Sequence, residues 1–367
     1  MKEITKIVIT GGPCAGKSTA MSKIQTAFTE LGYTVLFVPE TASELITGGV
    51  APWTCGTNRD YQICQMRLQM EKERIWLRAA ETMKGERFLI VCDRGTMDNR
   101  AYMNEEEFAY VLEHFGTGEV ELRDGYDAVF HLVSAAKGAE EFYTKANNAA
   151  RTESIEEAAA LDDKLIAAWT GHPHLRVIDN ASFFDDKMNR LIAEIKSFLG
   201  EPEPTEIERK YLIEYPDLDR LESLPSCRKV EIVQTYLRSR GGEETRVRRR
   251  GIDGHYMYFK TEKRGISGLC RIESERRLSK DEYLELLKDA DPSRAIIHKT
   301  RYCLTHKNQY FEIDVYPFWQ DRAIMEIELS DEGDTIEFPD VINIIREVTE
   351  DKEYKNSSLA EFFANRN

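Results

Sequence analysis

Residues 206–210 read Glu-Ile-Glu-Arg-Lys, and residues 326–328 repeat the first three letters as Glu-Ile-Glu. In a β-strand, side chains at positions i, i+2 and i+4 lie on one face. Glu206, Glu208 and Lys210 therefore share a face that carries two carboxylates and an ammonium group. If that face points into an enclosed space, a highly charged ligand such as a divalent metal or a polyphosphate must neutralise its charges.

Further stretches between these two motifs alternate in the same way. They are Arg246-Val247-Arg248, Arg271-Ile272-Glu273-Ser274-Glu275, Lys299-Thr300-Arg301 and Glu312-Ile313-Asp314, and Lys260 ends the strand-like stretch 256–259. Charge at every second residue of several strands predicts an antiparallel sheet that closes into a barrel with a polar lumen. The alternative is a set of solvated strand faces joined by cross-strand salt bridges, which would explain any single pair.

Residues 205 to about 362 resemble the CYTH family, also called triphosphate tunnel metalloenzymes, whose N-terminal signature Glu-x-Glu-x-Lys is matched at 206–210. That family includes thiamine triphosphatases, inorganic triphosphatases and class IV adenylate cyclases. The resemblance implies an eight-stranded antiparallel β tunnel. Its basic residues would hold a triphosphate, and its acidic residues would hold Mg²⁺ or Mn²⁺.

The resemblance also implies which residues act. The residues expected to grip phosphate or take part in catalysis are Glu206, Glu208, Lys210, Arg246, Arg248, Lys260, Arg271, Glu273, Glu275, Lys299 and Arg301. The expected metal ligands are Glu206, Glu208, Asp314, Glu326 and Glu328. Arginine can contact phosphate in bidentate fashion, and carboxylates supply the hard oxygen ligands that Mg²⁺ and Mn²⁺ prefer.

A second motif lies at the start of the chain, where residues 11–19 satisfy the pattern G-x-x-x-x-G-K-S between an apolar strand, 6–10, and a helical stretch, 20–31. Glycines let backbone N–H groups approach phosphate oxygens, and the helix N-terminus adds positive potential. Lys17 would reach the β- and γ-phosphates, and Ser18 would hold Mg²⁺. The predicted nucleotide-binding residues are Gly11, Gly12, Pro13, Cys14, Ala15, Gly16, Lys17, Ser18 and Thr19.

Apolar strands that alternate with helical patterns follow this motif. The strands are 34–38, 88–92, 128–132 and 175–178, and helical stretches such as 61–82 and 155–169 separate them. This order predicts an α/β P-loop domain with a doubly wound parallel sheet. Ligands then bind at the carboxyl ends of the strands, where Glu40, Asp93 and Arg94 stand.

Residues 4 to about 199 resemble P-loop nucleoside and nucleotide kinases, and in particular the small AAA-like ATPase domain related to ribosylnicotinamide kinases. The resemblance implies ATP or GTP as ligand, Glu40 as the base for a substrate hydroxyl, Asp93 near Mg²⁺ and Arg94 near phosphate. Arg151 would be a lid arginine. Two alternatives remain, because Glu40 could cap the helix that follows it and Arg151 could be a solvated residue.

The linker and the charge complete the prediction. The Pro-containing segment 201–204 would separate a domain 1–200 from a domain 205–367. The net charge of −15 argues against a nucleic-acid partner, while the cations gathered between 206 and 301 favour a compact anionic ligand. No signal peptide or long apolar run is evident, so we expect a cytoplasmic protein without a transmembrane segment.

The predicted function is metal-dependent hydrolysis of inorganic, nucleoside or thiamine triphosphate in the C-terminal domain, beside an ATP- or GTP-binding N-terminal domain. A kinase for small, nucleoside-like molecules is an alternative, with the tunnel domain as sensor or scavenger. A nucleotide-binding adaptor with little turnover is another. Adenylate cyclase activity is a more distant interpretation. The sequence does not determine the oligomeric state or protein partners.

Overall fold

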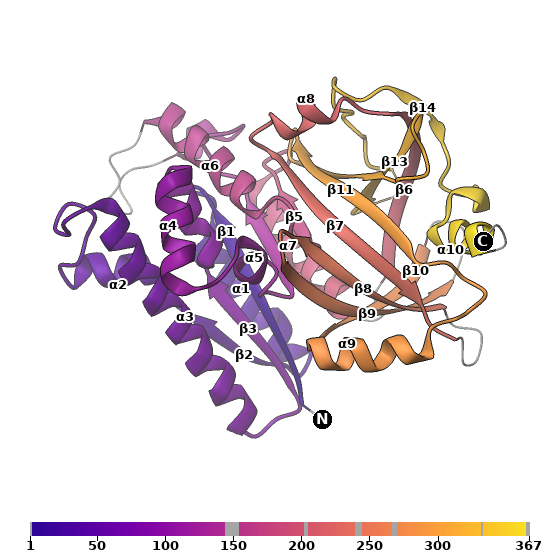
Figure 1. Cartoon of the computed structure of the whole chain (residues 1–367). Coiled ribbons are helices and arrows are strands. Elements are labelled where there is room, and N and C mark those ends of the chain that lie inside the picture. The colour runs from indigo at the N-terminus through magenta and orange to yellow at the C-terminus, as the bar shows by residue number, and fades with distance from the viewer. Residues whose placement is uncertain are drawn as a thin grey trace. The chain divides into compact units, whose positions relative to one another are not determined.

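The computed structural model describes residues 2–143, 154–201, 205–238, 244–265, 270–331 and 333–364. The chain forms two compact units, Met1–Ala193 (unit 1) and Glu194–Asn367 (unit 2) (Figure 1). The division falls within helix α7, just before the linker predicted at 201–204.

Unit 1 contains a five-stranded sheet whose strands are all parallel, in the order β2-β3-β1-β4-β5 (Figure 1). The strands are β1 (Glu3–Gly11), β2 (Thr34–Val38), β3 (Arg87–Asp93), β4 (Ala128–Leu132) and β5 (Leu175–Ile178). They confirm the predicted α/β fold with a parallel sheet. Strands β2 and β3 lie on one side of β1, and β4 and β5 lie on the other. The loop after β1 therefore lies where the strand order reverses, which is the usual place for a ligand in such sheets.

Helices connect these strands. They are α1 (Lys17–Glu30), α2 (Thr41–Thr47), α3 (Asn58–Thr82), η1 (Thr96–Tyr102), α4 (Glu105–Phe115), α5 (Glu119–Arg123), η2 (Glu140–Phe142), α6 (Ile155–Trp169) and α7 (Phe184–Leu199). Helix α6 begins with a capping box, in which Ser154 accepts from the Glu157 N–H and Glu157 accepts from the Ser154 N–H. Helix α3 is unusual because Gln62, Gln65 and Gln69 lie on its buried side.

Unit 2 contains a nine-stranded sheet in the order β10-β9-β8-β7-β11-β12-β13-β6-β14, with antiparallel pairings throughout. The strands are β6 (Thr205–Glu214), β7 (Cys227–Tyr236), β8 (Glu244–Ile252), β9 (His255–Gly265), β10 (Cys270–Leu278), β11 (Ile297–His306), β12 (Gln309–Val315), β13 (Arg322–Leu329) and β14 (Ile344–Glu347). Strand β10 also pairs with β6, so the eight strands β6 to β13 form a closed ring. The sheet was expected to have eight strands; the ninth, β14, pairs with the far end of β6.

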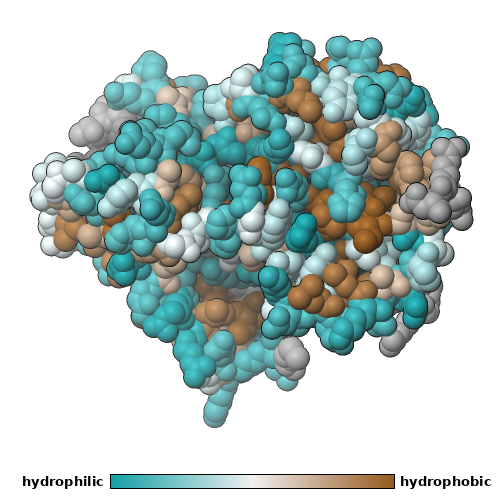
Figure 2. All heavy atoms as spheres, in the orientation of Figure 1, coloured by the Kyte–Doolittle hydropathy of each residue, from teal (hydrophilic) through white to brown (hydrophobic). Residues whose placement is uncertain are grey.

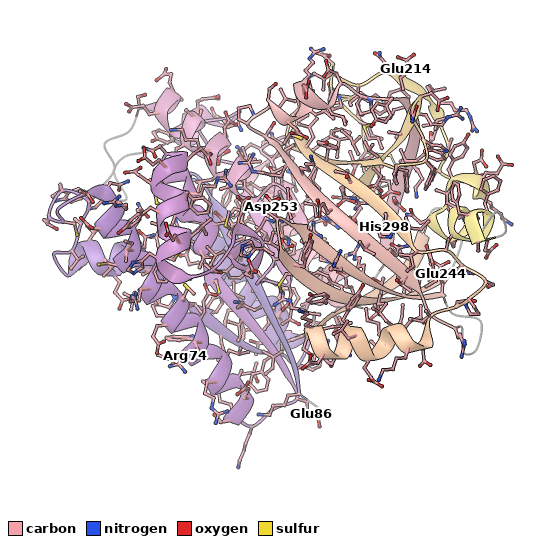
Figure 3. The ribbon with its side chains drawn as sticks, viewed as in Figure 1. Arg74, Glu86, Glu214, Glu244, Asp253 and His298 are labelled. Carbon is pink, nitrogen blue, oxygen red and sulfur yellow. The ribbon has the colours of Figure 1, made fainter. Side chains whose placement is uncertain are left out.

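Tight turns and short helices complete unit 2. The helices are α8 (Leu218–Glu222), α9 (Lys280–Leu286), η3 (Leu287–Asp289), η4 (Lys352–Tyr354) and α10 (Asn356–Ala364). Asp253 and Gly254 join β8 to β9 with φ of 52° and 88°, and Asp253 is labelled at this turn in Figure 3. Positive φ at both turn residues matches the right-handed twist of the two strands, and it fixes their register.

The strands of unit 2 have one apolar and one charged face. On the apolar face, Phe311, Ile313 and Met325 are fully buried. This face packs against α8 and against the segment that leads into β14. The apolar face is thus on the outside of the ring, and the alternate residues point to its inside.

The inner face is apolar at one end. Leu212 and Ile324 are register partners there, two residues along the strands from the partners Lys210 and Glu326 and on the same face. They pack with Leu359 and Ala360 of α10. Helix α10 therefore covers an apolar end of the ring, and the ionic residues lie deeper along the same strands.

Hydrophilic residues cover most of the face shown in Figure 2, as expected for a chain in which 31% of the residues are charged. Among the helices that the structure describes, none combines the length and the apolar character needed to cross a membrane.

We predict that Phe311→Ala lowers the free energy of unfolding of unit 2 by about 3–5 kcal/mol, because it leaves a cavity in the apolar cluster on the outer face of the ring, called the outer core below. The matched control is Ile345→Ala on β14, whose side chain is half exposed. Urea unfolding followed by circular dichroism measures both. Equal unfolding midpoints for the two variants would contradict this description of the outer core.

Candidate functional site

Five charged side chains meet on the inner face of unit 2 and are called the ionic cluster below. They are Lys210 of β6, Lys299 and Arg301 of β11, Asp314 of β12 and Glu326 of β13. Each side chain is between 0% and 9% exposed, so none is an ordinary solvated surface charge. The sequence predicted all five as site residues, and the structure brings them together.

Glu326 bridges two cations of the ionic cluster. Its Oε1 lies 2.6 Å from Lys210 Nζ, and its Oε2 accepts a hydrogen bond of 2.9 Å from Arg301 Nη2. Lys210 Nζ also lies 3.8 Å from an Oε1 of Glu208. Glu208 stands opposite Glu328 in the register of β6 and β13, so these two predicted metal ligands are neighbours along the sheet.

Asp314 holds the other side of Arg301. Arg301 donates to it through Nε and Nη2, each at 2.7 Å, in the bidentate arrangement that arginine makes with carboxylates. Lys299 also donates to Asp314. Glu312 was not predicted as a site residue, although it shares the alternation of Asp314. Its carboxylate pairs with Arg301 Nη1, and its side chain is 17% exposed.

Burial and charge shift the titration of this cluster in different directions. Burial works to lower the pKa of Lys210, but the carboxylates of Glu208 and Glu326 outweigh it and raise that pKa. For Lys299, burial and the nearby Arg301 together lower the pKa to about 8. Burial favours the neutral form of Glu326, yet Lys210 and Arg301 hold its pKa well below the usual value. Glu326 is therefore a carboxylate at neutral pH.

A second ionic pair lies on the inner face of β8 to β10. Arg248 Nη2 is 2.6 Å from Glu275 Oε2, which also accepts a hydrogen bond of 2.9 Å from Thr261 Oγ1. Arg246 is buried on the same face of β8, opposite Thr261. These contacts bring together three further residues that the sequence predicted: Arg246, Arg248 and Glu275.

Lys260 does not join them. Its register partner is Val247, which lies in the apolar cluster beneath α9, and its Nζ pairs with Glu262 at 2.6 Å. Lys260 is therefore on the outer face of the ring. The inner positions of β9 include Phe259, Thr261 and Lys263. Lys263, which was not predicted from the sequence, stands opposite Glu244 and Glu273 in the register.

Three predicted residues can be placed only through their backbone. Glu206 pairs in register with Arg271, and Glu273 pairs with Lys263. The side chains of Glu206, Arg271 and Glu273 lie outside the described residues.

The carboxylates of unit 2 have the donor chemistry that Mg²⁺ or Mn²⁺ prefers. Within the part of the chain that the structure describes, however, no three His, Cys, Asp or Glu side chains are arranged to hold a metal ion. In the ionic cluster, Asp314 and Glu326 are paired with lysine and arginine, and the side chain of Glu206 lies outside the described residues. The chemistry of the donor set fits a divalent metal.

The glycine-rich loop of residues 11–19 runs from β1 into α1, and its backbone requires glycine. Gly11 and Gly16 have φ of 144° and 94°. A Cβ on Gly12 would lie 2.8 Å from an Asp162 oxygen. Lys17 Nζ donates to the Gly11 carbonyl at 3.2 Å, so the lysine folds back over its own loop.

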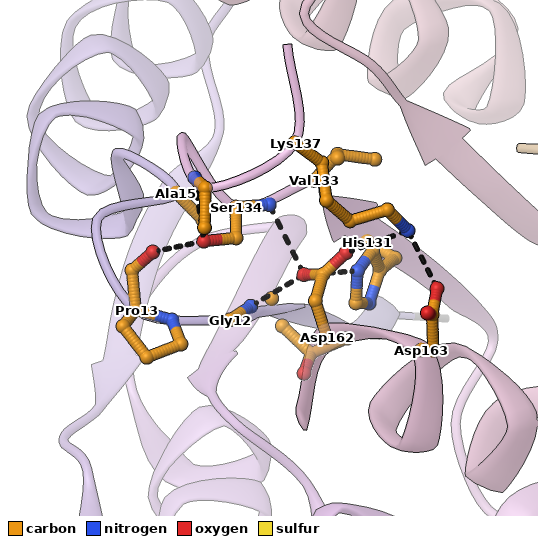
Figure 4. Close-up of polar contacts among 12 residues, drawn as sticks. Gly12, Pro13, Ala15, His131, Val133, Ser134, Lys137, Asp162 and Asp163 are labelled. Atoms are coloured by element: carbon orange, nitrogen blue, oxygen red, sulfur yellow. Dashed lines mark hydrogen bonds and ion pairs between the residues drawn. The ribbon is translucent and has the colours of Figure 1, made fainter. Parts of the chain in front are cut away.

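Asp162 of α6 holds this loop from outside (Figure 4). Its Oδ1 accepts from the Gly12 N–H at 2.9 Å and the Ser134 N–H at 3.1 Å, and it contacts His131 Nε2 at 3.0 Å. Ser134 Oγ donates to the Pro13 carbonyl at 2.5 Å, and Lys187 Nζ donates to the Ala15 carbonyl at 3.1 Å. No local sequence signal identifies these residues, because they come from distant segments.

The carboxyl ends of β2 and β3 bring Glu40, Asp93 and Arg94 toward Lys17. Arg94 Nε donates to Glu40 Oε1 at 2.6 Å. Burial and Arg94 lower the pKa of Lys17 to about 8, while burial raises the pKa of Asp93. Burial alone would raise the pKa of Glu40, but Arg94 and Lys17 lower it to about 2. Lys17 thus senses the charges of Arg94, Asp93 and Glu40.

Of the two alternatives that the sequence left open, the structure bears on the one for Glu40. Glu40 occupies the N-cap position of α2, but its side chain makes no capping hydrogen bond and pairs with Arg94 instead. Ser43 Oγ donates to its other oxygen at 2.5 Å. Arg151, the predicted lid arginine, lies outside the described residues.

A polar wall that the sequence analysis missed lies on the buried side of α3 and η1. Tyr61 Oη, Gln62 Oε1 and Asn99 Nδ2 are buried and have no hydrogen-bond partner among the residues that the structure describes. Gln65 Nε2 donates to Asn99 Oδ1 at 2.9 Å, which fixes the Asn99 amide. Glu40 is one of the charges that raise the pKa of Tyr61, so the wall adjoins the Glu40–Arg94 pair.

Comparison with known proteins finds one matching family and several similar proteins. Residues 6–186 match a family described as an AAA domain. An inorganic triphosphatase from Nitrosomonas europaea is 34% identical over 160 residues, which cover 42% of this chain and 97% of that protein. A crystal structure of an inorganic triphosphatase is 29% identical, with a TM-score of 0.29, over 42% of this chain and 94% of the other. A protein from Hippeastrum described as showing a dominant triphosphatase activity is 14% identical, with a TM-score of 0.27, over 34% of this chain and 80% of that protein.

We predict that Asp162 makes unit 1 sensitive to acid. Burial works to raise its pKa, but His131, Lys137 and the Gly12 N–H lower it to about 2, below the ordinary value of 3.8. The carboxylate therefore stabilises the fold above about pH 4, and this contribution, about 2 kcal/mol, is lost as the pH falls toward 2. Urea unfolding at a series of pH values should show this loss in the wild type and not in Asp162→Asn.

The matched control is Asp163→Asn. Asp163 is the next residue on α6, pairs with Lys137 and is 67% exposed. It should keep the acid dependence of the wild type. An identical pH profile for wild type and Asp162→Asn would show that the carboxylate of Asp162 does not stabilise the loop.

Proposed function

Because the chain belongs to the same family as the inorganic triphosphatase from Nitrosomonas europaea, we propose that it hydrolyses a phosphoanhydride bond of a small triphosphate compound at the ionic cluster of unit 2. One observation carries this proposal: Lys210, Lys299, Arg301, Asp314 and Glu326 are buried together inside a closed ring of strands.

Buried charges of this kind are a poor way to stabilise a fold. The free energy needed to remove two charges from water often exceeds the attraction between them. An apolar pair of similar size is often as stabilising or more so. Unit 2 already has a large outer core, to which Phe311, Ile313 and Met325 contribute. The inner charges therefore serve a ligand, and cations and carboxylates together suit a polyphosphate with its metal ion.

The residues divide by chemistry. We assign phosphate contacts to the cations of the inner face: Lys210, Arg246, Arg248, Lys299 and Arg301, with Lys263 in place of Lys260. We assign the metal to the carboxylates Glu206, Glu208, Asp314, Glu326 and Glu328. A bound Mg²⁺ or Mn²⁺ would neutralise charge on the phosphate oxygens. The cations would hold the chain of phosphates in one orientation and take up the negative charge of the leaving group.

We place inorganic triphosphate first among the substrates, ahead of nucleoside and thiamine triphosphates. The relative from Nitrosomonas europaea is an inorganic triphosphatase. In addition, the inner face becomes apolar next to the ionic cluster, where Leu212 and Ile324 pack against α10. A substrate made only of phosphate needs no contact with that layer.

We predict that Lys210→Gln lowers phosphate release from inorganic triphosphate by roughly 100-fold or more, because a preorganised charge at the phosphates is lost. Lys260→Gln is the matched control, since it removes a lysine from the outer face of the same sheet and should change the rate less than about threefold. Lys17→Ala in unit 1 should leave the activity intact. The assay is phosphate release with Mg²⁺ or Mn²⁺ across a panel of triphosphates. Equal loss in the two lysine variants would contradict the assignment of faces.

We propose that unit 1 binds ATP or GTP at the glycine-rich loop and transfers the γ-phosphate to a small molecule. Lys17 and Ser18 stand at the start of α1, and Glu40, Asp93 and Arg94 approach Lys17 from the neighbouring strands. Ser18 and Asp93 have suitable oxygens for Mg²⁺, and the donor set fits. Glu40, held as a carboxylate by Arg94, would accept the proton of the acceptor hydroxyl.

The polar wall of Tyr61, Gln62 and Asn99 favours this second activity over a nucleotide-binding adaptor. Buried polar atoms without partners are costly, and they are commonly satisfied by a ligand or water. The wall offers hydrogen-bond donors and acceptors but no net charge. It thus suits an uncharged acceptor with hydroxyl or amide groups. An adaptor would bind nucleotide but release or transfer no phosphate above background.

We predict that Glu40→Gln reduces γ-phosphate transfer from ATP or GTP to a panel of ribosides by roughly 100-fold, because the proton acceptor is lost. Binding of a fluorescent nucleotide should change little, and triphosphate hydrolysis in unit 2 should not change. Glu44→Gln, which removes an exposed carboxylate from the same helix, is the control. Transfer at the wild-type rate by Glu40→Gln would remove the role assigned to Glu40.

A further inference from the structure

The cations and carboxylates of the ionic cluster neutralise one another directly. Lys210 and Arg301 contact Glu326 at 2.6 and 2.9 Å, and Arg301 and Lys299 both donate to Asp314. The groups expected to hold phosphate are thus bound to the groups expected to hold metal.

A triphosphate that enters without a metal must compete with these carboxylates. To reach phosphate, Lys210 and Arg301 have to leave Glu326, whose side chain is 8% exposed. A buried carboxylate left without its partner is strongly unfavourable. The phosphates would also lie against the negative charges of Glu326 and Asp314.

A metal ion that enters alone meets the opposite obstacle. It has to displace Lys210 or Arg301 from Glu326, or Lys299 from Asp314. The displaced cations would then be buried beside a divalent cation. Each ligand alone therefore breaks ion pairs that it cannot replace.

When metal and triphosphate enter together, new ion pairs replace the ones that are broken. The cations turn from carboxylate to phosphate, and the carboxylates turn from lysine and arginine to the metal. Every buried charge keeps a partner of opposite sign. We propose that the ion pairs of the cluster make binding of metal and triphosphate mutually dependent, so that unit 2 excludes free triphosphate and free metal and accepts the two together. This inference rests on the proposed function, because it takes a triphosphate as the ligand of the cluster.

The attraction between metal and phosphate would by itself give some coupling, but the ion pairs predict an additional, crosswise effect. Removing a carboxylate frees its cations, so metal-free triphosphate should bind more tightly. Removing a cation frees its carboxylate, so metal alone should bind more tightly. Each variant gains affinity for one ligand although it loses hydrolysis.

The test measures binding to the full chain. The triphosphate probe is imidotriphosphate, whose P–N–P bridges resist hydrolysis, titrated by calorimetry in EDTA or with excess Mn²⁺. Binding of Mn²⁺ alone is followed by the electron paramagnetic resonance signal of the free ion. The Mn²⁺–imidotriphosphate complex in solution is measured separately and included in the binding cycle.

In the wild type we expect each ligand to raise the affinity for the other by at least about 30-fold, with the same factor in both directions. Glu326→Gln should bind imidotriphosphate in EDTA roughly tenfold more tightly than the wild type. Lys210→Met should bind Mn²⁺ alone roughly tenfold more tightly. Glu214→Gln is the control for charge alone, since it removes an exposed carboxylate from the same strand, β6, at the position labelled in Figure 3, and it should change either affinity less than about twofold.

The proposal is overturned if the wild type binds imidotriphosphate equally well with and without Mn²⁺. It is also overturned if Glu326→Gln leaves metal-free binding unchanged or weaker. Should Glu326→Gln fail to fold, Glu312→Gln replaces it, because Glu312 pairs with Arg301 and is more exposed. It should likewise tighten metal-free binding.

The same samples separate this inference from the proposed function. Crosswise gains without phosphate release from inorganic triphosphate would retain coupled binding and reject the hydrolase. Phosphate release without crosswise gains would retain the hydrolase and reject the role of the ion pairs.

Discussion

The burial of the Glu326 carboxylate between Lys210 and Arg301 is the interaction on which the structure of unit 2 depends. These groups come from β6, β13 and β11, which lie within four consecutive strands of the sheet, and the pairing of β10 with β6 closes the ring around them. Closed in this way, they have no bulk water to solvate them, and each must find a partner of opposite charge. The same constraint that makes the fold costly prepares the site for a charged ligand.

Apolar packing on the outer face of the ring and against α10 offsets the cost of burying these charges. The apolar faces of β12 and β13 pack outward through Phe311, Ile313 and Met325, and this burial supplies stability that the inner face does not. Helix α10 covers the apolar end near Leu212 and Ile324. The ionic residues are thus confined to one part of the inner face, where their mutual contacts define the site.

In unit 1 the ordered feature is the glycine-rich loop between β1 and α1. Its backbone bends are possible because Gly11 and Gly16 adopt positive φ. The loop is then fixed from outside by Asp162, Ser134 and Lys187, which bind its N–H and carbonyl groups. Under the proposed functions both units would bind phosphate, unit 1 through a backbone loop and unit 2 through side chains on strands.

The sequence by itself determined the strands of unit 1, the glycine-rich loop and the alternation that placed Lys210, Arg301, Asp314 and Glu326 in one site. Apolar runs and period-two charge are local properties, so they can be read without a structure. Tertiary structure decided which face Lys260 and Lys263 occupy, because the Asp253–Gly254 turn sets the register of β9, and a shift of one residue reverses every side chain. It also decided the pairing of Glu312 with Arg301, the ninth strand and the Asp162 contacts, since these join residues far apart in the chain whose proximity no local pattern contains.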